Sequence, residues 1–130
     1  MKKIIFLAMF SQFIFACGDP VKTQIQSVKN SSKDTILLTR IQNNIKEKFN
    51  ILPNVQTDIF IGSEFGKASE VSCISMSLVD SVYITTKSKK KLIKDIEDDK
   101  NWTSTYSAGK GSTTGSDQKC VFEIFDNDLK

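Results

Sequence analysis

The sequence predicts an α+β fold, in which one long helix packs against a small and mostly antiparallel β-sheet. Three features of the 130-residue chain support this prediction. Apolar residues recur every three or four positions between residues 33 and 50, as on a helix with one buried face. After Pro53 the apolar residues alternate every second position, which is typical of strands. Stretches rich in Gly and Ser separate these runs, as loops do.

The first residues have the layout of an export signal. Two lysines follow Met1, and a largely apolar stretch covers residues 4–16. This stretch is shorter than the roughly 20 apolar residues that a membrane-spanning helix needs. We therefore interpret residues 1–16 as a cleaved signal peptide.

The end of that stretch, Ile14-Phe15-Ala16-Cys17, resembles the lipobox of bacterial lipoproteins. Ile14 and Ala16 match the pattern, whereas Phe15 stands where a smaller residue is usual. The resemblance implies that signal peptidase II cleaves before Cys17 and that this residue carries diacylglycerol, usually with a further acyl chain. Two or more acyl chains anchor a protein durably in a bilayer. The alternative is an ordinary secretory signal with an unrelated cysteine near its end.

The residues after the cysteine bear on location and on domain organisation. In lipoproteins of enteric bacteria, Asp directly after the lipidated cysteine retains the protein at the inner membrane, and this chain has Gly18 there. The resemblance therefore implies a lipid-anchored protein of the outer membrane that faces the periplasm. Residues 17–33 are mostly polar and are expected to form a tether. Residues 34–130 are expected to form a single α+β domain.

The long helix is expected at about residues 33–50. Its apolar face consists of Leu38, Ile41, Ile45, Phe49 and Leu52. Ser31 and Asp34 have the spacing of a capping box, and Pro53 ends the helix. We expect the apolar face to pack against the sheet.

Strands are expected at residues 58–62, 71–79 and 82–86, with a loop at residues 62–70. A second helix is expected at about residues 89–99, although its lysines come first and its acids last, which opposes the helix dipole.

The chain is expected to end in a β-hairpin. Trp102, Ser104 and Tyr106 alternate with threonines, and residues 120–125 form a run rich in aromatic and apolar side chains. Residues 108–119 are rich in Gly, Ser and Thr and are expected to be the loop between the two strands.

Two cysteines lie within the expected domain, Cys73 and Cys120. In an exported protein an even number of cysteines favours disulfide bonding, so we expect these two to form one structural disulfide. The alternative is a redox-active or metal-binding thiol pair, but the chain has neither a C-x-x-C spacing nor a histidine to support it.

Composition argues against several classes of function. The absence of histidine excludes Ser-His-Asp and Cys-His catalysis and His-ligated zinc sites. The formal net charge of +3 includes the two leader lysines, so the mature chain is nearly neutral and gives no support for nucleic-acid binding. A Gly-Lys-Gly-Ser-Thr run at residues 109–113 departs from the phosphate-binding loop at two required positions. We expect no catalytic residue, metal, cofactor or small-molecule substrate.

Two features are candidate contacts with a partner. Phe65 lies in the polar loop at residues 62–70, and exposed aromatic residues often anchor protein interfaces. Lys87 and the candidate contacts Lys89, Lys90 and Lys91 form a basic run that could bind anionic groups. The alternatives are core packing for Phe65 and a solvated face for the lysines.

The sequence thus predicts a lipid-anchored envelope protein that is not an enzyme and that binds a protein of unknown identity. It would serve as a component of an envelope or secretion machine. The alternative is a periplasmic inhibitor or immunity protein against a cell-wall hydrolase or toxin, because small size, one disulfide and membrane tethering suit that role.

Overall fold

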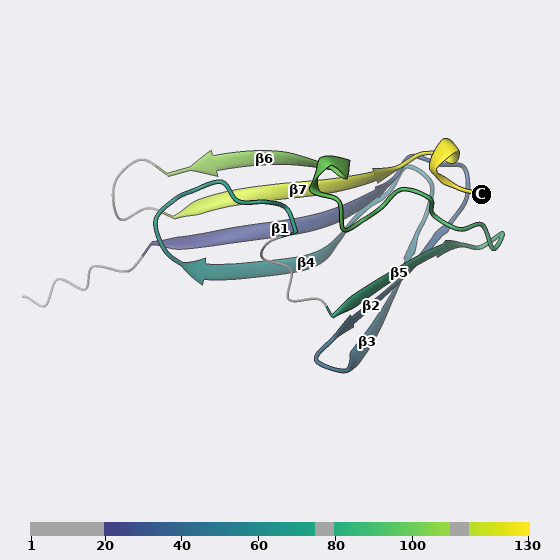
Figure 1. Ribbon diagram of the computed structural model, residues 1–130, viewed down its shortest axis with the longest axis horizontal. Coiled ribbons are helices and arrows are strands. Elements are labelled where there is room, and N and C mark those ends of the chain that lie inside the picture. Colours follow the sequence, from purple (N-terminus) through teal and green to yellow (C-terminus); the bar gives the residue numbers. More distant parts are fainter. Residues whose placement is uncertain (1–19, 75–79, 110–114) are drawn as a thin grey trace, which may run out of the picture.

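The computed structural model describes residues 20–74, 80–109 and 115–130 (Figure 1). These residues form seven strands in two sheets, and their only helical elements are the 3-10 turns Asp99–Asn101 and Asp126–Asp128. The protein is therefore mostly β, and the predicted α+β class is wrong.

The first sheet has four strands in the order β4-β1-β7-β6. Its members are β1 (Val21–Asn30), β4 (Gln56–Phe65), β6 (Trp102–Ala108) and β7 (Ser116–Ile124). β1 pairs with β7 in parallel and with β4 antiparallel, and β6 pairs antiparallel with β7. These strands lie side by side along the long axis of the molecule (Figure 1).

The second sheet has three antiparallel strands in the order β3-β2-β5. They are β2 (Ile36–Gln42), β3 (Ile45–Ile51) and β5 (Ser81–Thr86). This sheet is steeply inclined to the first one and lies toward one end of it (Figure 1).

The segment predicted as the long helix, residues 33–50, contains the hairpin β2–β3 instead. Asn43 and Asn44 have φ angles of 50° and 63°, and a tight two-residue hairpin turn of type I′ requires positive φ at both positions. Leu38 and Phe49 are directly opposed across the two strands. Apolar residues placed on both strands of this hairpin thus imitate the spacing of one helix face.

The expected tether, residues 17–33, is also corrected, because residues 21–30 form β1 in the interior of the first sheet. The polar composition that suggested a tether belongs to a buried strand. Its buried polar residues are Gln24, Gln26, Ser27 and Asn30. Polar side chains are tolerated in such a place when they find hydrogen-bond partners. Ser27 Oγ donates to Asp58 Oδ1 at 2.6 Å, and the partners of Gln24 Nε2, Gln26 and Asn30 are described below. Gln24 Oε1 is buried without a partner among the described residues.

The second predicted helix, residues 89–99, is an irregular segment. Lys91 and Leu92 form single antiparallel bridges with Thr85 and Leu129, and turns follow them. In this segment the lysines come first and the acids last, which is unfavourable for a helix dipole and agrees with the absence of a helix there. Of the expected strand 71–79, residues 71–74 are loop and turn, and residues 75–79 lie outside the described residues.

The remaining strand predictions are confirmed. Residues 58–62 lie within β4, residues 82–86 lie within β5, and β6 and β7 form the expected antiparallel pair. The loops are shorter than predicted, because β4 continues to Phe65 and β7 begins at Ser116. The disulfide Cys73–Cys120 is confirmed, with a Cα–Cα distance of 5.6 Å.

The apolar core lies where the second sheet packs against one end of the first. Its buried members are Val28, Ile36, Leu38, Ile51, Ile59, Phe122, Ile124 and Leu129. Trp102 packs on Phe122 with ring centroids 5.3 Å apart. At the other end of the first sheet, polar contacts and the disulfide take the place of an apolar core.

Candidate functional site

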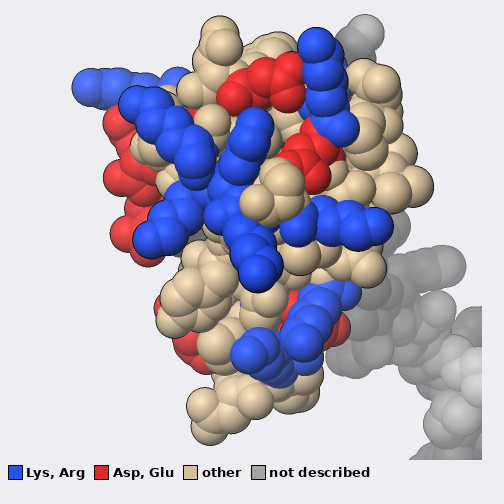
Figure 2. Space-filling view, turned by 90° about the vertical axis from the view of Figure 1, so that its right-hand side faces the viewer, with Lys and Arg blue, Asp and Glu red and all other residues tan. Residues whose placement is uncertain are grey.

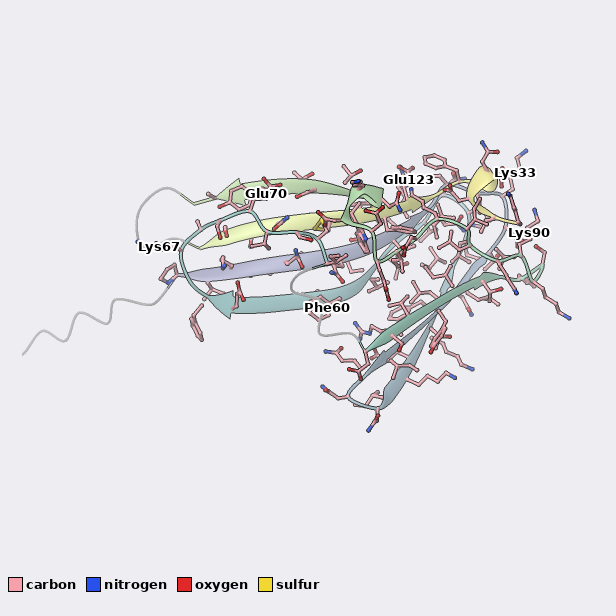
Figure 3. The ribbon with its side chains drawn as sticks, viewed as in Figure 1. Lys33, Phe60, Lys67, Glu70, Lys90 and Glu123 are labelled. Carbon is pink, nitrogen blue, oxygen red and sulfur yellow. A yellow bond between two sulfur atoms is a disulfide. The ribbon has the colours of Figure 1, made fainter. Side chains whose placement is uncertain are left out.

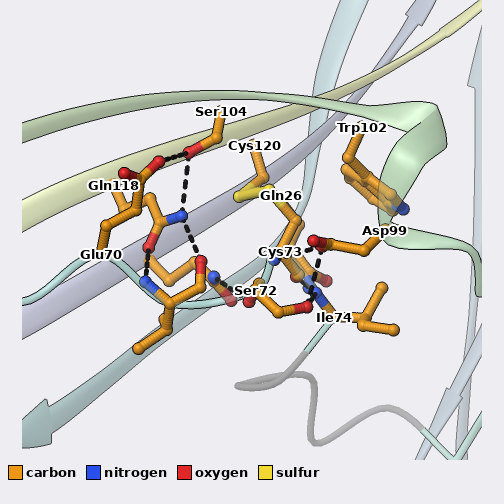
Figure 4. Close-up of a disulfide and its surroundings, with 12 residues drawn as sticks. Gln26, Glu70, Ser72, Cys73, Ile74, Asp99, Trp102, Ser104, Gln118 and Cys120 are labelled. Atoms are coloured by element: carbon orange, nitrogen blue, oxygen red, sulfur yellow. Dashed lines mark hydrogen bonds between the residues drawn. A yellow bond between two sulfur atoms is a disulfide. The ribbon is translucent and has the colours of Figure 1, made fainter.

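A polar layer on one face of the first sheet makes it a rigid frame (Figure 4). Residues 70–74, the strap, cross this face. Gln118 Nε2 donates to the Val71 carbonyl at 2.6 Å, and Gln118 Oε1 accepts from the Val71 N–H at 3.1 Å. Gln24 Nε2 donates to the Ser72 carbonyl at 3.0 Å, and Gln26 donates to the Cys73 carbonyl. These hydrogen bonds explain how polar side chains can be buried on the central strands β1 and β7.

The strap is also fixed by the disulfide and by Asp99. Cys73 and Cys120 are 3% and 0% exposed, so the bond that joins them is closed off from solvent. Asp99 Oδ1 accepts from Ser72 Oγ at 2.8 Å and from the Cys73 N–H at 2.7 Å. A buried disulfide with these neighbours is a structural cross-link, and the frame it stabilises holds the two ends of the sheet in fixed positions.

Asn30 organises the end of the frame at which β1 finishes. Its side-chain Nδ2 donates to the carbonyls of Asp34 and Ile51, each at 2.8 Å. Its Oδ1 accepts from the N–H and the hydroxyl of Ser32, at 3.0 and 2.7 Å. One fully buried side chain therefore shapes the connection from β1 to β2, which presents Lys33 to solvent.

Six exposed lysines gather at this end, and we call them the lysine cluster (Figures 2 and 3). Its members are Lys33, Lys87, Lys89, Lys90, Lys91 and Lys130. Backbone hydrogen bonds bring the three parent segments together. The Lys87 N–H donates to the Thr35 carbonyl at 2.9 Å, and Lys91 and Lys130 exchange N–H···O bonds of 2.6 and 3.0 Å.

The carboxylates of the same segments are already engaged. Asp126 Oδ1 accepts from the Lys33 N–H at 2.9 Å, and Asp128 Oδ2 accepts from the Phe125 N–H at 2.9 Å. Asp34 accepts from the Ser88 hydroxyl, which is the main reason that the pKa of this carboxyl lies below its ordinary value. Among the described residues, no lysine of the cluster has a carboxylate within ion-pair distance. The lysine ammonium groups of the cluster are therefore not held in ion pairs within the described residues, although Asp34, Asp126 and Asp128 lie in the same segments.

The neighbouring cation Lys29 shows the contrast. Lys29 Nζ lies 2.7 Å from Glu123 Oε1, and Ser31 Oγ donates to the same oxygen at 2.5 Å. The hydrogen bond from Lys29, followed by that from Ser31, lowers the pKa of Glu123. This group holds the end of β7 to the β1–β2 connection, so it has a structural use that the lysine cluster lacks.

Phe65 lies at the opposite end of the first sheet, where β1 begins. It pairs with Val21 across the two strands, and its side chain is 77% exposed. The Gly66 N–H donates to the Pro20 carbonyl at 2.9 Å, and Lys22 Nζ lies 2.6 Å from Glu64 Oε1. Figure 3 places the nearby Lys67 at this end, away from Lys90. Phe65 is thus a surface residue, not a core residue.

The two predicted partner contacts are therefore separated. Phe65 and Lys90 lie at opposite ends of the sheet, and β1, with its 10 residues, spans about 30 Å between these ends. Sequence reasoning missed Lys33 and Lys130, because only the fold brings them beside residues 87–91. Cys17, the predicted lipidation site, lies outside the described residues.

A cleft of about 380 Å³ opens between the two sheets. Gln26, Ile59 and Trp102 contribute to its wall, together with Ile74 and Asp80. Residues 75–79 connect the last two and lie outside the described part of the chain, so we assign no role to this cleft. In residues 20–74, 80–109 and 115–130, no three side chains of the His, Cys, Asp or Glu type are grouped to bind a metal ion.

Comparisons with known proteins leave the function to be argued from these features. The chain matches no protein-family model, no curated protein and no solved structure. Within the described residues, no helix has the length and apolar character needed to cross a bilayer.

Proposed function

We propose that this protein is a lipid-anchored component of the cell envelope that binds an acidic partner protein through its lysine cluster. The membrane anchor is the acylated Cys17, as the lipobox Ile14-Phe15-Ala16-Cys17 implies. The observation that carries the proposal is that the lysine cluster lies at the last residues of β1, whereas Cys17 precedes the first residue of this strand by four positions in the sequence.

Chain geometry supports this arrangement. Cys17 precedes the first residue of β1, Val21, by four positions, which an extended chain covers in at most about 14 Å. The start of β1 therefore lies close to any bilayer that holds Cys17. The lysine cluster lies about 30 Å farther along the strand. An anchored protein would thus keep this cluster available to other components of the envelope.

The composition of this end suits an acidic protein partner. The lysines provide charge that steers and orients an acidic surface. Phe125, on the same end, is 47% exposed and can supply an apolar anchor beside Lys33, whose N–H is bound by the adjacent Asp126. Aromatic anchors within a charged rim are typical of protein interfaces. We propose that the charged groups of the lysine cluster serve recognition, and we propose no catalytic role for a chain without histidine.

Two steps test the proposal in the bacterium of origin. The first is labelling with an alkyne analogue of palmitate, where the wild type should be labelled and Cys17→Ser should not. The second is crosslinking in intact cells, followed by capture of the lipoprotein and identification of bound proteins. The charge-reversal variant K87E/K90E/K91E should lose the captured partner.

The control for charge reversal is K46E/K48E, which is compared with K87E/K90E as well, so that both variants reverse two charges. Lys46 and Lys48 are exposed lysines of β3, away from the lysine cluster. This variant should retain the partner. Equal capture by both variants would contradict a role for the lysine cluster, and unlabelled wild-type protein would contradict the anchor. Capture of a cell-wall hydrolase that the purified protein inhibits would identify an inhibitor instead of a machine component.

A further inference from the structure

Exposed or half-buried apolar side chains lie on the outer face of β1 and β4 in two pairs, which we call the apolar stripe. Between the two pairs lie Thr23 and Ser63, whose hydroxyl oxygens are 3.3 Å apart. Val21 is paired with Phe65, and Ile25 is paired with Ile61. These four side chains share one face, because the register is continuous from Val21 to Gln26 and side chains alternate between faces. Phe65 is 77% exposed and Ile61 is 64% exposed. The polar strap covers the other face, so this stripe is separate from the frame described above.

The chain segment that leads to Cys17 leaves the domain beside Phe65. The hydrogen bond from the Gly66 N–H to the Pro20 carbonyl, 2.9 Å long, fixes the departing chain to the end of β4. Three residues farther back is Cys17, so the two positions are at most about 11 Å apart along an extended chain. A lipid on Cys17 would thus keep Phe65 close to the membrane surface.

We propose that Phe65 inserts into the lipid–water interface of the bilayer that holds the anchor, with Val21 beside it. This inference rests on the proposed lipidation of Cys17. It makes the start of the first sheet a second membrane contact and orients the domain, so that the lysine cluster points away from the bilayer.

The side chains around Phe65 suit a membrane surface. Lys22 is neutralised by Glu64 at 2.6 Å, so this pair adds no net charge. Lys67 is exposed at the same end and can meet lipid phosphates. An aromatic ring with a nearby lysine is a common arrangement at the headgroup level of bilayers. Exposure of so large an apolar side chain is costly in water, and interfacial burial removes that cost.

The test places a fluorescent probe at Phe65 in the full lipidated protein. Phe65→Trp and the control Phe125→Trp are each reconstituted into vesicles of phosphatidylethanolamine and phosphatidylglycerol whose acyl chains carry bromine, a contact quencher. Both positions are exposed, so neither substitution disturbs the core. Trp102 is kept as a common background, and wild-type emission is subtracted.

The added emission of Phe65→Trp should be shifted to the blue and mostly lost on brominated vesicles, whereas that of Phe125→Trp should be unchanged. Equal, weak quenching of both variants in protein that floats with the vesicles would overturn the membrane contact and leave the anchor intact. A blue shift without quenching, in protein that has become dimeric, would assign the stripe to a second copy and also overturn it. Wild-type protein that does not float with vesicles would overturn the anchor, and this inference with it.

Discussion

Gln118 satisfies both backbone hydrogen-bonding groups of Val71. Its amide nitrogen donates to the carbonyl at 2.6 Å and its amide oxygen accepts from the N–H at 3.1 Å, as a paired strand would. One side chain of β7 thus takes the place of a paired strand at Val71 and adds to the contacts of the strap with Gln24, Gln26 and Asp99. The strap also carries Cys73, whose disulfide with Cys120 joins it to the same strand.

Replacing Gln118 by Ala should destabilise the protein by about 2 kcal/mol, since it leaves both groups of Val71 without these partners. Urea unfolding followed by circular dichroism measures this loss. Gln56→Ala, at an exposed glutamine of β4, is the control and should change stability by less than about 0.5 kcal/mol. Equal losses in the two variants would show that the pairing of Gln118 with Val71 contributes little.

The β2–β3 turn makes a prediction that separates the observed hairpin from a helix. Asn44, with φ of 63°, lies in the left-handed region, where a β-branched residue is disfavoured. Asn44→Val should therefore cost about 1–2 kcal/mol. Asn44→Gly should be neutral or slightly stabilising. In a helix the order would be reversed, because glycine lowers helix stability more than valine does. Thermal unfolding of the two variants gives the order directly.

Lys89 combines charge with an unfavourable backbone conformation. Its φ of 65° costs about 1–2 kcal/mol for a residue with a Cβ, and glycine avoids this cost. Glycine also loses more chain entropy on folding, which offsets about 0.5–1 kcal/mol of the stabilisation. Lys89→Gly should therefore raise the unfolding free energy by up to about 1 kcal/mol. It should also weaken capture of the proposed partner. Lys90→Gly removes the same charge from a residue without positive φ, so it should weaken capture with no gain in stability. A Lys89→Gly protein that is both less stable and fully active in capture would contradict both parts.

Stability at acid pH should depend on Glu123. The folded-state pKa of this carboxyl lies below its ordinary value of 4.5, mainly because Lys29 donates to it. The stabilisation is complete above pH 4.5 and is lost as the pH falls through the lowered folded-state pKa. Urea midpoints between about pH 6 and pH 3 should therefore fall more steeply for the wild type than for Glu123→Gln. Parallel curves for the two proteins would rule out this contribution.

Local features of the fold could be predicted from the sequence, whereas features that depend on strand pairing could not. Val82 and its neighbours, the β6–β7 hairpin and the Cys73–Cys120 bond were all predicted, because alternation and cysteine number report on them directly. The β2–β3 hairpin was missed because the Asn43–Asn44 turn lacks the glycine that usually marks type I′, and the apolar residues of its two strands then matched a helix.

β1 was missed for a different reason. Its buried residues Gln24 and Gln26 are polar, and partners far along the chain, Ser72 and Cys73, make their burial favourable. Only some residues of the candidate site could be predicted from the sequence. Phe65 and residues 89–91 were selected as surface features, but their separation to opposite ends, and the addition of Lys33 and Lys130, follow from strand pairing that no local pattern encodes.

The central claim is that acylated Cys17 holds one end of this β domain at a bilayer while the lysine cluster stays accessible at the other. The most direct measurement combines palmitate-analogue labelling with reaction of the lysines in intact spheroplasts, using an amine reagent that does not enter membranes. We predict a labelled, membrane-bound wild type whose Lys87, Lys90 and Lys91 react readily, and an unlabelled Cys17→Ser protein released from the membrane. A wild type that carries no label, or a Cys17→Ser protein that remains membrane-bound, would contradict the account.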